Sequence, residues 1–176
     1  MKRLIILIIV IAVIFAAWAL FFRGPLGYDE FKAVESKYKQ PDELVPSTLE
    51  NINGYKQDML FLKGKYSGSE EAVLLADIKL DLADIEENLI VAGNEFSKID
   101  RRNPDCSDGG SISKAQKLLD ASSKKVLEVE KNSKKLEASH KGFADASGVS
   151  GEQFKQSVAG ISSSMENIYS IIKSYC

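Results

Sequence analysis

The chain has 176 residues, with 44% hydrophobic and 27% charged side chains and a formal net charge of −2. This length suits one domain, and the count of one His, two Cys and four Pro excludes collagen-like chains, Cys-rich disulfide scaffolds and multi-Cys zinc scaffolds. Beyond residue 23, 25 acidic side chains exceed 20 basic ones, which argues against a nucleic-acid partner and against a polybasic lipid-binding surface.

The first predicted element is an unbroken apolar run from Leu4 to Phe22. As a helix it would span roughly 28 Å, which matches a hydrocarbon core of about 30 Å. Lys2 and Arg3 precede the run, so the positive-inside rule keeps the N-terminus cytoplasmic and exports the rest of the chain. We therefore expect residues 1–23 to be a transmembrane signal anchor in the lipid bilayer, and the protein to be a single-pass protein of the cell membrane.

A cleaved signal peptide is the alternative for this segment. Ala17 and Ala19 offer small residues before a cut. However, the apolar run is longer than the usual h-region of about 7–15 residues, and the bulky Leu20, Phe21 and Phe22 follow the cleavage position. These features favour an uncleaved anchor, with the bulk of the chain extracytoplasmic.

The exported part is predicted to be all-α. We expect residues 24–41 to form a juxtamembrane linker or short helix and residues 42–176 to form a helical bundle. In the latter, apolar residues recur at alternating spacings of three and four, which is typical of helices that bury one seam, as in a coiled coil. Short polar breaks between helices favour an antiparallel up-down four-helix bundle, with helices over 42–66, 69–101, 111–142 and 150–175.

The four predicted helices differ in regularity and charge. The helix over 42–66 contains Gly54 and Gly64, each of which costs about 1 kcal/mol relative to Ala, so it is expected to kink or fray first. Residues 70–100 carry a net charge of −7 and residues 111–141 a net charge of +4. This opposition predicts that the second and third helices pair.

The two cysteines are predicted to meet at one end of the bundle. Cys106 lies in the loop between the second and third helices, and Cys176 ends the fourth. In an exported protein this placement predicts a disulfide, which would contribute roughly 4 kcal/mol by closing a loop of about 70 residues. Two unpaired thiols, or an intermolecular bridge through Cys176, are the alternatives.

The sequence offers no set of residues for catalysis, cofactor binding or metal binding. Glu137 and His140 have the E-x-x-H spacing of di-iron bundles, but those proteins use two such motifs and this chain has one His. Asp105 opens a stretch that resembles a calcium loop, yet its twelfth position is Gln116 instead of Glu. We therefore expect a protein that is not an enzyme and that needs no cofactor.

One stretch is similar to a known family. Residues 44–55 read LVPSTLENINGY, which resembles the L-I-P-N-L-V-E-T-V-K-G-Y stretch of LemA-family proteins, and Tyr28 resembles the family's Tyr-Asn after the anchor. The linker before Leu44 is shorter than in that family, its Gln-Leu-Lys-Arg-Arg stretch is absent, and no match extends beyond Tyr66. The resemblance implies a membrane-tethered helical envelope protein and carries over no catalytic residue.

These observations favour a non-enzymatic, prokaryotic-style envelope protein that acts as an interaction or scaffold module. Its expected partners are other membrane or envelope proteins, and a second copy of the chain is one candidate. The alternative is an extracytoplasmic sensor subunit that binds a small ligand and signals through a partner membrane protein. The polar residues Ser122, Ser133 and His140 in the predicted seam motivate this alternative.

Overall fold

A computed structural model describes residues 27–41, 43–100 and 102–175. These residues form six helices and no strand, which confirms the all-α prediction for the described part of the chain. The helices are α2 (Tyr28–Tyr38), α3 (Leu49–Lys65), α4 (Glu70–Ser97), α5 (Ser111–Ser139), α6 (Lys141–Ala146) and α7 (Glu152–Lys173).

None of these helices is long and apolar enough to cross a membrane. The predicted anchor over residues 1–23, including the apolar run from Leu4 to Phe22, lies outside the described residues.

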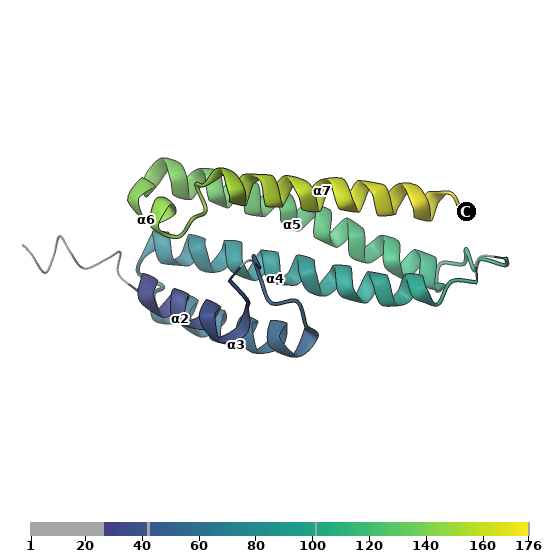
Figure 1. Cartoon of the computed structure of the whole chain (residues 1–176), viewed down its shortest axis with the longest axis horizontal. Coiled ribbons are helices and arrows are strands. Elements are labelled where there is room, and N and C mark those ends of the chain that lie inside the picture. The colour runs from purple at the N-terminus through teal and green to yellow at the C-terminus, as the bar shows by residue number, and fades with distance from the viewer. Residues whose placement is uncertain (1–26, 42, 101, 176) are drawn as a thin grey trace, which may run out of the picture.

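The helices run antiparallel along an elongated molecule (Figure 1). The long hairpin of α4 and α5 forms its centre, α7 runs along α5, and the shorter pair α2 and α3 lies against one half of α4. The start of α2 and the short helix α6 share one end of the molecule, whereas the α4–α5 loop and the end of α7 share the other.

The predicted first helix begins later than the sequence suggested. The helix expected over 42–66 starts at Leu49, because Thr48 has an extended backbone and its hydroxyl accepts a hydrogen bond from the Asn51 N–H. The residues before Thr48 form a loop instead of a helical turn, yet Val45 in this loop is buried. In addition, part of the predicted linker over 24–41 forms α2, and this helix packs against α3.

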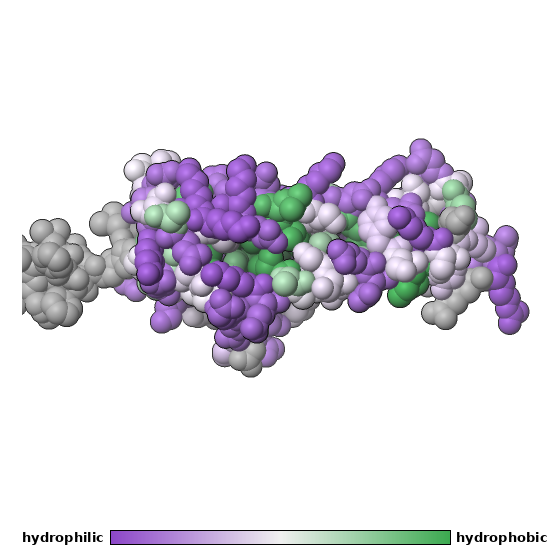
Figure 2. Space-filling view, turned by 90° about the horizontal axis from the view of Figure 1, so that it is seen from above, coloured by the Kyte–Doolittle hydropathy of each residue, from purple (hydrophilic) through white to green (hydrophobic). Residues whose placement is uncertain are grey.

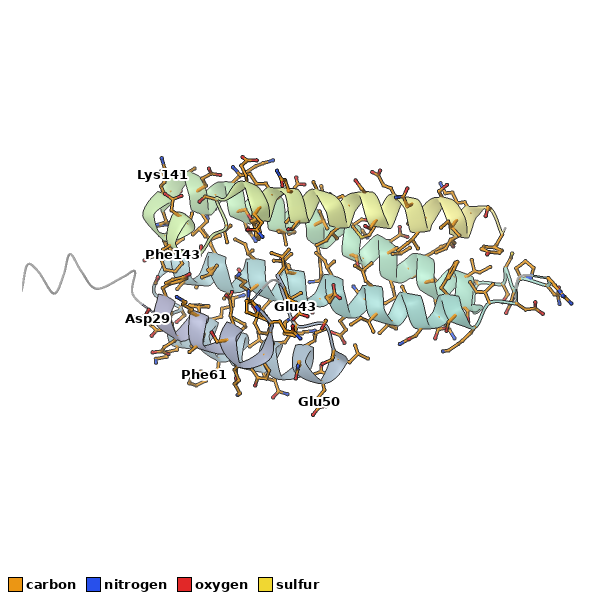
Figure 3. All side chains as sticks on the ribbon, viewed as in Figure 1. Asp29, Glu43, Glu50, Phe61, Lys141 and Phe143 are labelled. Atoms are coloured by element: carbon orange, nitrogen blue, oxygen red, sulfur yellow. The ribbon has the colours of Figure 1, made fainter. Side chains whose placement is uncertain are left out.

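The predicted third helix ends earlier than expected. It was expected to run over 111–142, but α5 ends at Ser139, because His140 adopts a non-helical backbone with φ −139° and ψ 52°. The short α6 then brings Phe143 into the core, with its ring centroid 6.0 Å from that of Tyr28 (Figure 3). The end of α5 and the start of α2 are thereby linked through α6.

Burial along α4 is uneven. Nine of its ten buried residues lie between Glu70 and Glu87, and Ala92 alone is buried beyond them. We call α4 residues 70–87 with α2 and α3 the covered half, and α4 residues 88–97 with the facing parts of α5 and α7 the open half. The expected four-helix bundle is therefore not even along its length, because the short α3 does not reach the open half (Figure 1).

Charge pairs hold the covered half together. Lys125 of α5 lies 2.8 Å from Asp81 and 2.6 Å from Asp84, which agrees with the predicted pairing of the acidic and basic helices. From α2, Glu35 contacts the buried Lys79 of α4 at 2.6 Å. Burial lowers the pKa of Lys79, whereas the Glu35 carboxylate opposes this shift. Because either charge would be costly to bury alone, this pair fixes α2 on α4.

Candidate functional site

The structure places Cys106 beside the end of α7. Its Sγ lies 3.7 Å from the carbonyl oxygen of Tyr175, the residue before Cys176. Cys176 itself lies outside the described residues. The disulfide between the two cysteines therefore stays a prediction, and the position of Cys106 favours it.

The polar residues that motivated a ligand site do not converge. The hydroxyl of Ser122 donates to the carbonyl oxygen of Leu118, and the hydroxyl of Ser133 donates to that of Val129, both within α5. Hydroxyls that bond back to their own helix in this way are a common local arrangement. The hydroxyl protons of these serines are therefore used within α5 and are not directed at a ligand between the helices.

The E-x-x-H residues also point to different neighbours. His140 lies next to two carboxylates at the start of α4, with Nε2 3.5 Å from Glu70 and Nδ1 3.8 Å from Glu71. Glu137 instead pairs with Lys155 of α7 at 3.5 Å. The two residues of the motif thus serve two different helix contacts and do not form a common ligand pair.

A groove between α4 and α7 is the strongest candidate site. It has a volume of about 510 Å³ and is closed at one side by the loop before α3, where Glu43 lies in front of α4 (Figure 3). Its lining residues come from three segments that are far apart in the sequence: Glu43, Leu44, Val45, Ser47, Leu82, Glu86, Leu89, Ser157, Gly160, Ile161 and Ser164.

The groove has an apolar floor and a wall of small residues. Leu82 and Val45 are buried at its base, whereas the α7 wall presents Ser157, Gly160 and Ser164. A Cβ atom added to Gly160 would meet no heavy atom within 4 Å. Because small residues let another helix approach closely, this wall has the form of a helix-contact surface.

The electrostatics of the groove centre on Glu86. This side chain is partly buried, and burial, together with the carboxylate of Glu43, raises its pKa. Glu43 itself is held in the charged form, because hydrogen bonds from the Gln40 N–H and from Ser47 lower its pKa. The groove therefore presents two acidic groups beside an apolar floor.

Glu86 differs from every other carboxylate of α4. The other seven each have a Lys or His nitrogen within 4.0 Å, and they are Glu70, Glu71, Asp77, Asp81, Asp84, Glu87 and Glu95. Most of these cations come from α3 and α5, the helices that pack on α4. No such pair is found for Glu86 among the described residues, and Glu86 faces the side of α4 that no helix covers.

An apolar hollow of about 120 Å³ continues this face into the open half. Leu89 lines both the groove and the hollow, and Phe96 of α4 and Ile168 and Ile171 of α7 also line the hollow. Here too there is open space beside a helical glycine, since a Cβ atom on Gly93 would meet nothing within 4 Å. The groove and the hollow together form one strip between α4 and α7.

A second furrow lies between α5 and α7. Figure 2 shows apolar surface between rows of hydrophilic side chains on this face, and Leu127, which is 65% exposed, lines it. The charges along this furrow compensate one another, because Lys134 pairs with Glu130 and Lys155 pairs with Glu137. Glu166 also lines this furrow and has no such ion pair within the described part of the chain, but its side chain is exposed, whereas Glu86 is partly buried.

No family model, curated protein or solved structure matches this chain. The resemblance of residues 44–55 to LemA-family proteins therefore stays a prediction. Sequence reasoning did not select Glu86 and Gly160 of the groove, although Leu44, Val45 and Ser47 in its lining belong to the stretch 44–55. The run of serines at 162–164 was a weak signal for it, since Ser164 lies in its wall.

Proposed function

We propose that this protein is a non-enzymatic, membrane-anchored, extracytoplasmic helical bundle that acts as an interaction or scaffold module of the envelope. The apolar run from Leu4 to Phe22 supports the anchor. The basic residues before the run support export of everything that follows it.

The position of α2 supports a defined orientation at the membrane. This helix begins at Tyr28, five residues after Arg23, and is fixed to the bundle by the buried Phe31 and by the pair of Glu35 and Lys79. An anchor attached there would hold α6 and the α3–α4 turn near the bilayer. The open half and the end of α7 would then extend away from it.

The strip between α4 and α7 is the observation that carries the binding role. An interaction surface should combine apolar area with groups that are unpaired until a partner arrives. In the described residues, the strip has both properties, because its floor is apolar and Glu86 faces it without a cation. A scaffold function follows from such a surface held at a fixed height above a membrane.

Protease accessibility and membrane crosslinking test this function. In cells that carry the full chain, external protease should digest the bundle while the membrane remains intact, and chemical crosslinking should yield discrete complexes with envelope proteins. A bundle that is protected inside the cell would contradict the location. Absence of any crosslinked complex would contradict the scaffold role.

A small-ligand sensor remains the second candidate function. A groove of about 510 Å³ is within the size range of small-molecule sites, which is the observation that favours it. The full chain in detergent micelles should then show a higher melting temperature with one member of a metabolite panel. The interaction module predicts no such shift.

A further inference from the structure

We propose that the strip between α4 and α7 binds an amphipathic helix of another envelope protein, and that this helix places a Lys or Arg against Glu86. This inference rests on the proposed function and names the chemistry of its partner. In the open half the occupant would take the position of the missing fourth helix, and its end would reach Glu86 at the edge of the covered half.

The charge pattern of α4 supports a basic occupant. Both α3 and α5, which pack on α4, supply cations to its carboxylates, as Lys56 and Lys63 do from α3 and Lys125 does from α5. Glu86 lies on the same helix as these carboxylates and is acidic like them, but it faces the side of α4 that no helix covers. The positive charge of a cation there would oppose the two effects that raise the pKa of Glu86, which are burial and the neighbouring Glu43 carboxylate.

Two glycines support a helix as the occupant. Gly93 and Gly160 lie inside α4 and α7, where Gly costs about 1 kcal/mol relative to Ala. Among the described residues, no neighbouring atom would clash with a side chain at either position, because an added Cβ would meet nothing within 4 Å. Both line or adjoin the strip, where the absence of a side chain lets a third backbone come close.

The length of the strip sets the size of the occupant. From Leu82 to Phe96, the α4 side covers 14 residue steps, or about 21 Å at 1.5 Å per residue. This length corresponds to roughly four helical turns. An occupant helix of that size would present apolar residues at spacings of three and four toward Leu89 and Ile168. Its cation would lie near the end of the occupant that is closer to the loop before α3.

Site-specific photocrosslinking of the full chain in its own membranes tests this proposal. A photoreactive phenylalanine analogue replaces Ser164 in the groove wall. The matched control positions are Phe61, an apolar side chain that is 69% exposed on the outer face of α3 (Figure 3), and Lys124 on α5. The captured peptide is then identified by mass spectrometry.

The expected result is capture from Ser164 of a peptide with helical apolar spacing and a Lys or Arg near the crosslink. Glu86→Lys should reduce this capture at least about tenfold, because it places like charges together. Glu50→Lys, a charge reversal on the exposed side of α3 (Figure 3), should leave it unchanged. Reversing the partner's basic residue to Glu should restore capture by the Glu86→Lys chain.

Filling the groove gives an independent test that does not depend on charge. Gly160→Leu should reduce capture from Ser164, whereas Gly64→Leu should not, although Gly64 also has open space around it. The melting temperature of each variant, measured in detergent micelles, should stay at or above that of the parent chain. A blocked groove is thereby separated from an unfolded bundle.

The remaining outcomes overturn the proposal in distinguishable ways. Capture that is insensitive to Glu86→Lys, a captured segment without a basic residue, or a crosslink to a second copy of this chain would refute the basic helical partner. Capture from Phe61 or Lys124 but not from Ser164 would also refute it and leave the scaffold function standing. Capture from none of the positions would refute both.

Discussion

The covered half and the open half of this bundle are built from the same helices and yet differ in what they bury. In the covered half, α4 packs against α3 as well as α5, most of its apolar side chains are buried, and its carboxylates other than Glu86 lie beside Lys or His. In the open half, Leu89 and Phe96 are partly exposed, and Gly93 faces open space. Burial, not helix content, therefore distinguishes the two halves, and the strip runs from the edge of the covered half into the open half.

The comparison also explains the role of the predicted disulfide. The covered half is closed by core packing and by the buried pair of Glu35 and Lys79. In the open half α4 buries only Ala92, and Cys106 lies at the far end of this half, beside the end of α7. A covalent link at that end would hold α7 to the α4–α5 loop.

The largest expected effect is at this end. Cys106→Ser should lower the free energy of unfolding of the oxidised chain by about 4 kcal/mol, because the disulfide would constrain a loop of about 70 residues in the unfolded state. Thermal unfolding in detergent micelles, followed by circular dichroism, measures the loss. Reductant should produce the same loss in the parent chain and none in the variant. Non-reducing mass mapping that finds both thiols free would contradict the disulfide.

The next largest effect should come from truncating apolar side chains, and its cost should differ between the two halves. Ile78→Ala in the covered half should cost about 3 kcal/mol, because Ile78 is fully buried and the substitution leaves a cavity. Phe96→Ala in the open half should cost clearly less, although it removes more atoms, since Phe96 already contacts solvent. Chemical denaturation of both variants tests this order, and equal losses would show that the open half is packed as tightly as the covered half.

Glycine replacement should change sign between the halves. A Cβ atom on Gly54 of α3 would lie 2.7 Å from the ring of Tyr38 of α2, so Gly54→Ala should destabilise the bundle by about 1–3 kcal/mol. In contrast, Gly93→Ala should stabilise it by up to about 1 kcal/mol, since no neighbour obstructs the added methyl group. The melting temperatures of the two variants should therefore move in opposite directions from that of the parent chain.

The smallest effects concern two carboxylates that lie two residues apart. Hydrogen bonds from Lys125 and Lys56 lower the pKa of Asp84 despite the opposing effect of its burial, so Asp84→Asn should destabilise the bundle at neutral pH by about 1 kcal/mol. Burial and Glu43 raise the pKa of Glu86. Glu86→Gln should therefore stabilise the bundle at neutral pH, by less than about 1 kcal/mol.

The pH dependence of the two variants should differ as well. Asp84 takes up its proton in the folded state below the ordinary value of 3.8, so its contribution is present above that pH and is lost as the pH falls further. Glu86 takes up its proton in the folded state above the ordinary value of 4.5. Its unfavourable contribution therefore fades as the pH falls toward 4.5. At that pH most of the gain from Glu86→Gln should be lost, and the remainder should disappear below it, while the cost of Asp84→Asn persists.

Much of this molecule is set by local sequence. The apolar seam of α4 and the caps at Thr48 and Ser69 determine that the chain forms helices and where two of them begin. Short-range backbone preferences and a 3.6-residue period are sufficient for this, because each depends on neighbours along the chain. The opposite charges of α4 and α5 likewise predict their pairing.

Other features depend on contacts between distant segments. The sequence suggested that Gly54 would weaken its helix, whereas the structure uses this glycine for the approach of Tyr38, 16 residues earlier in the chain. The break at His140 was not expected, because the apolar spacing continues through it to Phe143. In both cases a packing partner from another helix decides the local outcome.

The sequence by itself determined the helical class, the acidic and basic helices and the apolar run that predicts an anchor. Composition and periodicity suffice for this, because they are properties of the linear amino-acid sequence. Tertiary structure alone decided that Glu86, among eight similar carboxylates of α4, faces a side without a cation. Which charge stays unpaired is determined by the neighbours that surround it in space, and these come from segments far apart in the chain.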